Sequence, residues 1–352
     1  MVDTCPDDRE ACRVGRPSFV LRPSSSRANE PMRQIDLSIV VVSYHVRELL
    51  AQCLRSVISD RWTVPSKNLA TGDWRLSTEI FVVDNASRDD SAAMVRDQFP
   101  QAHLIENAEN RGFAAANNQA FAQTRGRYVM MLNPDTAIRP GALATLVQFM
   151  DAHPRAGACG GKLLYGDGTL QHSAFAFPSL AQILLDFFPL NWRLTDSRLN
   201  GRYPRAWYTR GVPFQTDHPL GADFLVRREA AEQAGWLDDG YFIYCEEIDW
   251  AIRIKRAGWQ IWCVPQAEIV HHEAQSTSQF REAMYTELWR ASKRLFEKHF
   301  SPLFRWAARL IVRAGLWYAV RKAHAAARAG KVTPEELGKR LGAYEQVKRI
   351  FV

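Results

Sequence analysis

The sequence of 352 residues predicts an α/β fold with a doubly wound sheet and a helical extension at the C-terminal end. Short apolar, β-branched runs recur along the first 140 residues, and segments with the apolar spacing of helices separate them. Aspartates follow two of these runs directly. Because ligands bind beyond the carboxyl ends of the strands in such sheets, the same pattern predicts where a site lies.

The predicted elements alternate between strand and helix. Ile35–Tyr44 (IDLSIVVVSY) has the continuous apolar pattern of a strand that is buried on both faces. A helical pattern begins at Glu48, and a second buried strand covers Glu79–Asn85 (EIFVVDN). The segments that follow are helix DSAAMVRDQF, strand AHLIEN, a helix in NRGFAAANNQAFAQT and strand YVMML.

Two aspartates end successive βα units of this half. Asp84 closes the FVVD strand, and Asp135 follows YVMML after Asn133-Pro134. Proline cannot continue a central strand, so it ends the strand just before the acid. Each aspartate alone is better explained as a turn or cap residue, whereas the two together favour a binding site. Carboxylates at the sheet edge of a basic chain indicate a divalent metal, because they would repel a polyphosphate alone.

The second half of the chain has a different pattern. Asp167-Gly168 between two strand-like runs predicts a hairpin. The segment Phe175–His218 has no clear hydrophobic periodicity and is interpreted as a lid or as a long loop that faces the acceptor. GADFLVRREAAEQAG predicts a strand and a helix that ends at Gly235. A later strand ends on His271-His272, which are potential metal ligands or merely solvated residues.

The densest group of carboxylates stands in YFIYCEEIDWAIRIKRAGW. Tyr241–Tyr244 predicts an aromatic strand, and the helix after it has Glu246, Asp249 and Arg253 on one side. Acids at a helix start are stabilised by the helix dipole, and two neighbouring acids also suit a general base. The residues alone leave these two interpretations open.

Composition limits the function classes. The net charge of +7 and the pI near 9.2 favour an acidic partner, namely nucleic acid, an anionic lipid surface or a phosphorylated ligand. No zinc spacing, aromatic-basic strand motif or recognition helix supports nucleic-acid binding, and no G-x-G-x-x-G follows the first strand of a dehydrogenase. The six scattered cysteines and the lack of a signal-peptide or membrane-spanning run predict a cytoplasmic protein.

The two ends of the chain are expected to differ from the centre. Residues 1–34 have the composition of a disordered tail, and residues 279–352 predict amphipathic helices. Within 303–322, Arg305, Arg309 and Arg313 line one helix face. The apolar face comprises Leu303, Trp306, Ala307, Leu310, Ile311, Ala314, Trp317 and Tyr318. This pattern fits a peripheral membrane contact, and it fits equally a helix that packs on the catalytic domain or on a second copy.

Taken together, these segments resemble the inverting family 2 glycosyltransferases of the GT-A fold, especially the bacterial rhamnosyltransferase-like branch. The matching segments occur in the family's order and are SIVVVSY, EIFVVDNASRDDS, ENAENRGFAAANNQAF, YVMMLNPDT, GGKLLYGDGTLQHS, GADFLVRREA, YFIYCEEIDWAIRIKRAGW and VHHEAQSTS. The resemblance covers about 35–278. It implies a Rossmann-like mixed sheet with a nucleotide-binding half at 35–136 and an acceptor or catalytic half at 137–278.

The resemblance also implies the chemistry. The donor is a nucleoside-diphosphate sugar, with dTDP-L-rhamnose as the best guess, and the cofactor is a divalent metal, Mg²⁺ or Mn²⁺. The acceptor is a saccharide or a polyprenyl-diphosphate-linked saccharide at the inner face of the cell membrane, in cell-surface polysaccharide synthesis. One displacement inverts the anomeric carbon. A catalytically inactive, sugar-nucleotide-binding scaffold is the alternative.

The resemblance assigns roles to the residues that match the family's motifs. Asp84 contacts the nucleobase or ribose, Asp135 is the main metal carboxylate and His272 is the metal-ligating histidine, with His271 the less expected partner. Glu247 is the catalytic base, although the match leaves Glu246 as a candidate. Glu246 and Asp249 support it by orienting acceptor hydroxyls or the helix. The remaining nucleotide-sugar contacts are Ser43, Tyr44, Arg111, Gly112, Asn117 and Asn133, the last replacing the first acid of a D-x-D motif.

Overall fold

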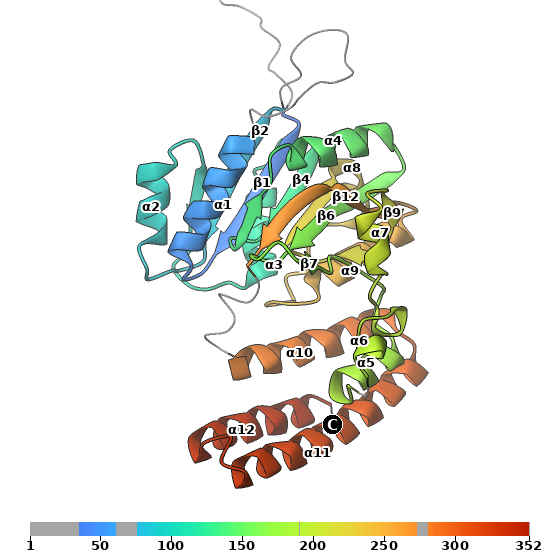
Figure 1. Cartoon of the computed structure of the whole chain (residues 1–352). Helices are drawn as coiled ribbons and strands as arrows, with labels where there is room; N and C mark the ends of the chain where they lie inside the picture. Colours follow the sequence, from blue (N-terminus) through green and yellow to red (C-terminus); the bar gives the residue numbers. More distant parts are fainter. Residues whose placement is uncertain (1–34, 61–75, 190, 273–280, 352) are drawn as a thin grey trace, which may run out of the picture. The chain divides into compact units, whose positions relative to one another are not determined.

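Four parallel strands form one half of the central sheet in the computed structural model, which describes residues 35–60, 76–189, 191–272 and 281–351 (Figure 1). β1 (Leu37–Ser43) lies between β2 (Thr78–Asp84) and β4 (Tyr128–Leu132), and β3 (His103–Glu106) pairs with β2. This half confirms the predicted βα units. The predicted tail at 1–34 lies outside the described residues.

The other half of the sheet makes it mixed. β11 (Asp223–Arg227) runs antiparallel to both β4 and β6 (Ala156–Leu164). β12 (Gln260–His271) is parallel to β6, and the short β5 (Thr136–Ile138) pairs antiparallel with β12. The strand order is therefore β3-β2-β1-β4-β11-β6-β12-β5. A mixed, Rossmann-like sheet is confirmed.

Each face of the sheet is covered by helices. Ile39 and Val41 of β1 pack in one core with α1 (Arg47–Asp60) and two further helices, α2 (Ser91–Gln98) and α4 (Ala142–Ala152). The alternate residues Val40 and Val42 pack in a second core on the opposite face, with α3 (Phe113–Phe121) and α9 (Glu246–Arg256). Burial of both faces explains why β1 reads as a continuous apolar run.

The smaller elements of the second half were predicted in part. β7 (Leu170–Gln171) returns antiparallel to β6 after a turn in which Gly168 has φ 82°, and α8 (Arg228–Ala234) ends before Gly235, as expected. The chain between β8 and β10 is more ordered than its sequence indicates. Its elements are β8 (Ala174–Phe175), α5 (Leu180–Phe187), α6 (Trp192–Thr195), η1 (Arg198–Asn200), α7 (Arg205–Thr209), β9 (Phe214–Gln215) and β10 (His218–Pro219).

Three helices form the C-terminal extension: α10 (Arg281–His299), α11 (Pro302–Arg328) and α12 (Pro334–Ile350). α11 packs on α5 so closely that a Cβ on Gly315 would collide with the ring of Phe187. The predicted boundary near residue 279 lies outside the described residues. Within the described parts of the chain, no helix has the length and hydropathy needed to span a bilayer.

Candidate active site

A cavity of about 420 Å³ opens at the carboxyl ends of the parallel strands. It is bounded by the loops that follow β1, β2 and β4, by the loop before β11 and by the start of α9, and α10 adds Met284 to its wall. The predicted site residues that line it are Tyr44, Gly112, Asn133, Asp135, Glu246 and Glu247.

Asp135 is brought to this cavity by the turn between β4 and β5. Pro134 interrupts the strand, and the amide of Thr136 donates to the carbonyl of Asn133 at 3.3 Å to close the turn. β5 then pairs with β12 so that Thr136 stands opposite His271. Asp135 and His271 are both buried, and Oδ1 of Asp135 lies 3.4 Å from Nε2 of His271.

The histidine beside Asp135 is His271, which corrects the expectation that His272 fills this position. His271 lines the cavity, whereas the ring of His272 lies near Gly166, where an added Cβ would approach its Nδ1 to 3.2 Å. His272 contributes only its backbone amide, which donates to the carbonyl of Asp135 at 2.9 Å. The cause is the alternation of side chains along an extended strand, which sends neighbouring residues to opposite sides.

The atoms around His271 fit a divalent metal. Its Nδ1 is 3.1 Å from Oε1, the side-chain amide oxygen of Gln171, and with Nδ1 as the donor the lone pair of Nε2 would face the Asp135 carboxylate. A lone pair opposite a carboxylate is favourable only with a cation between them, and an amide that orients a ligating imidazole is a common outer-shell arrangement. The described residues contain no cluster of three or more His, Cys, Asp or Glu for a metal. Asp135 and His271 would therefore supply two protein ligands.

The paired acids Glu246 and Glu247 follow a strained loop. Tyr241–Tyr244, predicted as a strand, is a loop, and Tyr244 and Cys245 have φ of 71° and 65°. Left-handed residues other than glycine cost about 1–3 kcal/mol each, so the surrounding packing must hold this conformation. The two strained residues turn the chain directly into α9, whose first residue is Glu246.

Burial outweighs the helix dipole at these two acids. Burial raises the pKa of Glu247 to about 7, although backbone amides at the helix start act in the opposite direction. Burial and the neighbouring charge of Glu247 raise the pKa of Glu246 well above its ordinary value. Gly221 faces Glu247, and an added Cβ there would lie 3.4 Å from the Cγ of Glu247. Glu246 is 4% exposed, whereas Glu247 is half-buried and reachable from the cavity.

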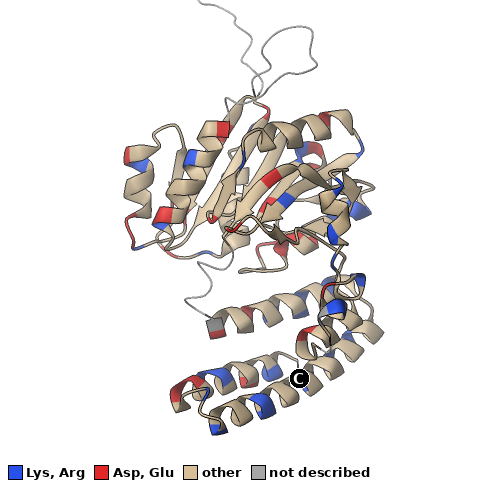
Figure 2. Cartoon of the chain, viewed as in Figure 1, with Lys and Arg blue, Asp and Glu red and all other residues tan. Residues whose placement is uncertain are grey.

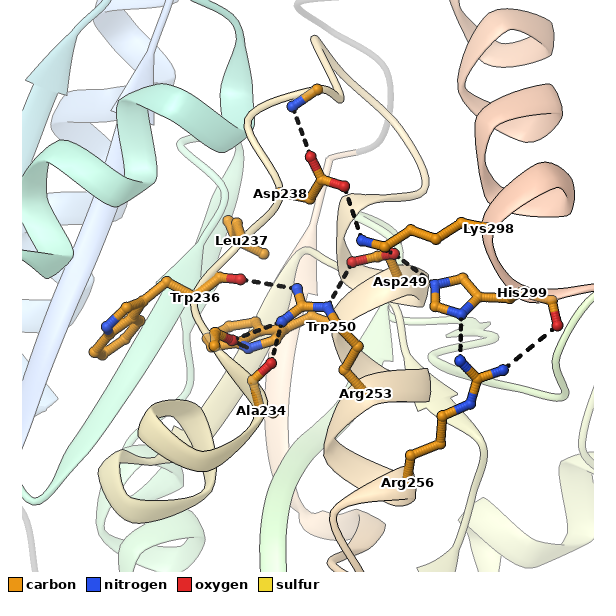
Figure 3. A network of polar contacts seen from close by, with 12 residues as sticks. Ala234, Trp236, Leu237, Asp238, Asp249, Trp250, Arg253, Arg256, Lys298 and His299 are labelled. Atoms are coloured by element: carbon orange, nitrogen blue, oxygen red, sulfur yellow. Dashed lines mark hydrogen bonds and ion pairs between the residues drawn. The ribbon is translucent and has the colours of Figure 1, made fainter.

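Asp249 anchors α9 rather than facing the cavity (Figure 3). Its carboxylate is fully buried and accepts from Nε of Arg253 at 2.8 Å and from Nε2 of His299 at 2.6 Å, with Nζ of Lys298 at 2.7 Å. Burial alone would raise the pKa of Asp249, but these donors hold it below its ordinary value. Of the two roles expected for Asp249, its contacts fit orientation of the helix.

The same network fixes the loop that leads to the acids. Lys298 and Arg294 of α10 both donate to Asp238, and Arg253 donates to the carbonyls of Ala234 and Trp236. α10 thereby fastens the beginning of the loop whose end lines the cavity. The C-terminal extension is thus part of the architecture that positions Glu246 and Glu247.

Replacement of Asp249 by alanine is expected to lower the free energy of unfolding by about 3–5 kcal/mol, because it leaves Arg253 and Lys298 without their buried counter-charge. Urea denaturation at pH 7 measures the change. Because the pKa of Asp249 is depressed in the folded state, its contribution is present above its ordinary value of 3.8 and is lost as the pH falls through the lower folded value. Glu345→Ala removes an exposed ion pair of α12 and is the control, expected to cost about 0–1 kcal/mol. Equal costs for the two variants would contradict the assignment.

Two buried polar atoms lack partners at the ends of β1 and β2. Ser43 and Asp84 stand opposite each other in the sheet register. Oδ2 of Asp84 accepts from the amide of Ser87 at 3.0 Å, but Oδ1 of Asp84 and Oγ of Ser43 have no hydrogen-bond partner among the described residues. A buried acceptor and a buried hydroxyl without partners are typical of positions that a polar ligand completes.

The loop before α3 is organised by Asn85, which was not among the predicted site residues. Asn85 donates to Oδ1 of Asn110 at 2.8 Å and accepts from the amide of Arg111 at 3.0 Å. Asn85 and Asn110 both line the cavity. Their position at a strand end and in the following loop is a signal, but asparagine is so common in turns that it does not identify a site.

Gly112 has a structural reason to be glycine. Its φ is 81°, and an added Cβ would lie 2.6 Å from the carbonyl oxygen of Phe242, in the loop before the acids. The other predicted residues of this segment do not reach the cavity: the side chain of Arg111 is exposed, and that of Asn117 is buried in α3 and donates to the carbonyl of Phe113 at 2.9 Å. Of these three predicted residues, Gly112 lines the cavity, whereas the side chains of Arg111 and Asn117 do not.

Comparison with known sequences gives a consistent group of relatives. The sequence model described as Glycosyl transferase family 2 matches residues 38–231. An N-acetylglucosaminyl-diphospho-decaprenol L-rhamnosyltransferase of Mycobacterium tuberculosis is 32% identical over 214 residues, which are 56% of this chain and 67% of the relative. The rhamnosyltransferase WbbL of Escherichia coli is 25% identical over 209 residues, which are 56% of this chain and 70% of the relative.

Solved structures share the fold at low sequence identity. The mannosyltransferase PcManGT of Pyrobaculum calidifontis, in complex with GDP-Man and Mn²⁺, has a TM-score of 0.51 at 18% identity, covering 91% of this chain and 85% of that one. GalNAc-T7 with UDP, GalNAc and Mn²⁺ also has a TM-score of 0.51, at 16% identity, covering 74% of this chain and 48% of that one. These likenesses show that the fold is GT-A.

Proposed function

Because the chain belongs to glycosyl transferase family 2 and is a glycosyltransferase, we propose that it transfers L-rhamnose from dTDP-L-rhamnose to a polyprenyl-diphosphate-linked saccharide. The choice of sugar is supported by the rhamnosyltransferases of M. tuberculosis and E. coli among its relatives, and the choice of acceptor by the decaprenol in the name of the first. The reaction would take place at the cytoplasmic side of the membrane. Sugar transfer in polysaccharide synthesis is the wider process to which the relatives belong.

The observation that carries the mechanism is a pair of acids in one cavity with Asp135 and His271. Glu247 accepts the proton of the acceptor hydroxyl as that oxygen attacks the anomeric carbon of the donor. The bond from the anomeric carbon to the diphosphate breaks, and the nucleoside diphosphate leaves with the bonding electrons. A single displacement of this kind inverts the anomeric configuration.

The pKa values support Glu247 rather than Glu246 as the base. With a pKa near 7, Glu247 is ionised in a large fraction of molecules at neutral pH, and its charge favours the protonated form of the more deeply buried Glu246. A protonated Glu246 can donate a hydrogen bond within the cavity. The two acids are thus proposed to take different roles, proton acceptor and hydrogen-bond donor.

Residues of the cavity wall and of the nearby ends of β1 and β2 are proposed to hold the donor. Asp84 and Ser43 have unpartnered buried oxygens for the nucleoside, and Tyr44 and Asn133 line the wall beside them. Asp135 and His271 would hold Mg²⁺ or Mn²⁺, which when bound neutralises negative charge on the diphosphate leaving group.

Turnover at saturating donor and metal is expected to rise with pH through an apparent pKa of about 7, because the base must be ionised to accept a proton. The measurement is a pH–rate profile between pH 5 and 9, with donor affinity measured over the same range as the control. Constant affinity together with a falling rate below pH 7 supports the proposal. A rate that stays constant down to pH 5 would contradict it.

Calorimetric titration with a panel of nucleoside-diphosphate sugars in the presence of Mn²⁺ tests the donor. The panel should include dTDP-L-rhamnose, dTDP-glucose, UDP-N-acetylglucosamine, GDP-mannose and free dTDP. We expect dTDP-L-rhamnose to bind most tightly, and a preference for another sugar would assign that donor instead. Binding with normal affinity but without turnover on any lipid-linked acceptor would favour the inactive scaffold.

A further inference from the structure

α11 carries two apolar faces, and only one of them is packed. Ala308, Val312 and Leu316 are buried in a core that includes residues of α5, α10 and α12, and on the helical wheel they lie opposite a second set of apolar residues. That second set, here called the α11 stripe, consists of Leu303, Trp306, Leu310 and Trp317, which are 72%, 59%, 48% and 62% exposed. The stripe comprises four of the eight residues of the apolar face predicted from the sequence, and it faces solvent.

The charged residues of α11 itself have a single sign. The helix contains five arginines and one lysine and no acidic residue, and Figure 2 shows its basic residues spaced along its length. Arg309 and Arg313 are exposed and lie next to the stripe on one side of the helical wheel. The guanidinium of Arg321 lies 4.6 Å from the ring centroid of Trp317, so a cation also sits over an aromatic member of the stripe.

We propose that the α11 stripe docks the protein on an anionic lipid bilayer surface. Tryptophan rings favour the interface between headgroups and acyl chains, where their apolar body and polar N–H are both satisfied. An in-plane helix of this kind buries its apolar face by several ångströms and holds its cations at the level of the lipid phosphates. Arg309 and Arg313 stand where they would meet those phosphates.

A second copy of the chain fits the stripe less well than a bilayer does. In a two-fold contact the same helix would face itself, and the arginines of each copy would meet those of the other without an acid on either α11 to neutralise them. Within the described residues, the four side chains of the stripe are exposed and do not pack on the chain's own catalytic domain. The bilayer is the occupant whose charge complements the helix.

Vesicle flotation of the full chain tests the proposal without any donor or acceptor, so its outcome is independent of the proposed transfer reaction. The vesicles are phosphatidylcholine alone and phosphatidylcholine with 30–40% phosphatidylglycerol, roughly the anionic range that makes charge visible. Two paired variants remove the stripe's features, Trp306→Ser with Trp317→Ser and Arg309→Glu with Arg313→Glu. Each is expected to weaken binding to the anionic vesicles by at least about tenfold, and 0.5 M salt is expected to weaken wild-type binding as well.

Matched controls alter the same chemistry elsewhere on the surface. Leu199→Ser with Val212→Ser removes two equally exposed apolar side chains, and Arg125→Glu with Arg155→Glu reverses two exposed arginines of the catalytic domain. Both control pairs are expected to float like wild type. Circular dichroism establishes that the stripe variants are folded, and quenching of wild-type tryptophan fluorescence by brominated lipid, reduced in the Trp306→Phe, Trp317→Phe pair, gives a second readout.

Two kinds of result would overturn the proposal. One is a flotation result, either wild-type protein that fails to bind anionic vesicles or stripe variants that bind them as well as wild type does. The other is a wild-type dimer that binds no vesicle and dissociates on Trp306→Ser with Trp317→Ser, as measured by sedimentation equilibrium, which would assign the stripe to a second copy.

Discussion

Glu247→Gln is expected to reduce sugar transfer by about 10²–10⁴-fold, the usual contribution of a positioned general base. The amide keeps the size of the side chain and its place beside Gly221, so the cavity and donor binding should be unchanged. The loss should therefore fall on kcat rather than on the donor KM. The measurement is initial-rate transfer at saturating donor, metal and acceptor.

Glu246→Gln is the matched comparison, because it removes the neighbouring acid with the same change of atoms. If Glu246 is already protonated, an amide reproduces its hydrogen-bonding capacity, and the loss should be well below that of Glu247→Gln. Because the neighbour of Glu247 is uncharged in both proteins, the acid limb of the pH–rate profile should keep its apparent pKa near 7. The reverse ranking of the two variants would assign the base to Glu246, and near-normal transfer by both would remove the pair from the mechanism.

His271→Ala is expected to raise the Mn²⁺ concentration needed for half-maximal turnover by more than about 10–100-fold, the loss seen for outer-shell partners of metal ligands. Asp135→Ala should have an effect at least as large, because it removes the carboxylate of the same pair. The change can be measured independently of turnover by the electron paramagnetic resonance of free Mn²⁺ in the presence of dTDP.

His272→Ala is the control for this prediction, since it deletes the same side chain one position along the strand. Its ring lies near Gly166 rather than in the cavity, so the Mn²⁺ dependence should remain at the wild-type value. A large effect of His272→Ala together with a small effect of His271→Ala would restore the ligand expected from the sequence.

Strands buried on both faces were the easiest elements to predict. β1 and β4 are buried at every position, and their largely apolar sequences lack the polar alternation of a strand with one exposed face. The hairpin at Gly168 and the end of α8 at Gly235 were also predictable, because positive φ at those turns selects glycine. These features depend on the preferences of a few neighbouring residues, so they can be predicted from the sequence alone.

The candidate site was predictable in type but not in detail. Side chains alternate between the two sides of a strand, so only one of His271 and His272 can face the cavity. Which of them does so depends on how β12 pairs with β5, and that pairing joins positions more than 130 residues apart in the sequence. The loop before α9 was mistaken for a strand because its aromatic residues have strand propensity, whereas the packing of Phe242 on Gly112 imposes a turn. Burial of Glu246 and Glu247, which sets their pKa values, likewise comes from tertiary structure.

Helical periodicity also left the C-terminal region ambiguous. Residues 303–322 contain apolar residues on two opposite faces of α11, and periodicity cannot tell which of them packs. The small residue Gly315 marks the packed face, because it allows the close approach of Phe187 of α5, and Ala308 is buried on the same face. The larger and more hydrophobic face, with Trp306 and Trp317, is the one left exposed.

The most direct test of the account is donor turnover by the purified protein with a polyprenyl-diphosphate-linked acceptor, across a panel of nucleotide sugars, with Mn²⁺ and with EDTA. We expect release of dTDP from dTDP-L-rhamnose that requires Mn²⁺ and is strongly reduced both by Asp135→Ala and by Glu247→Gln. Release that continues in EDTA at the same rate, or that survives both substitutions, would contradict it.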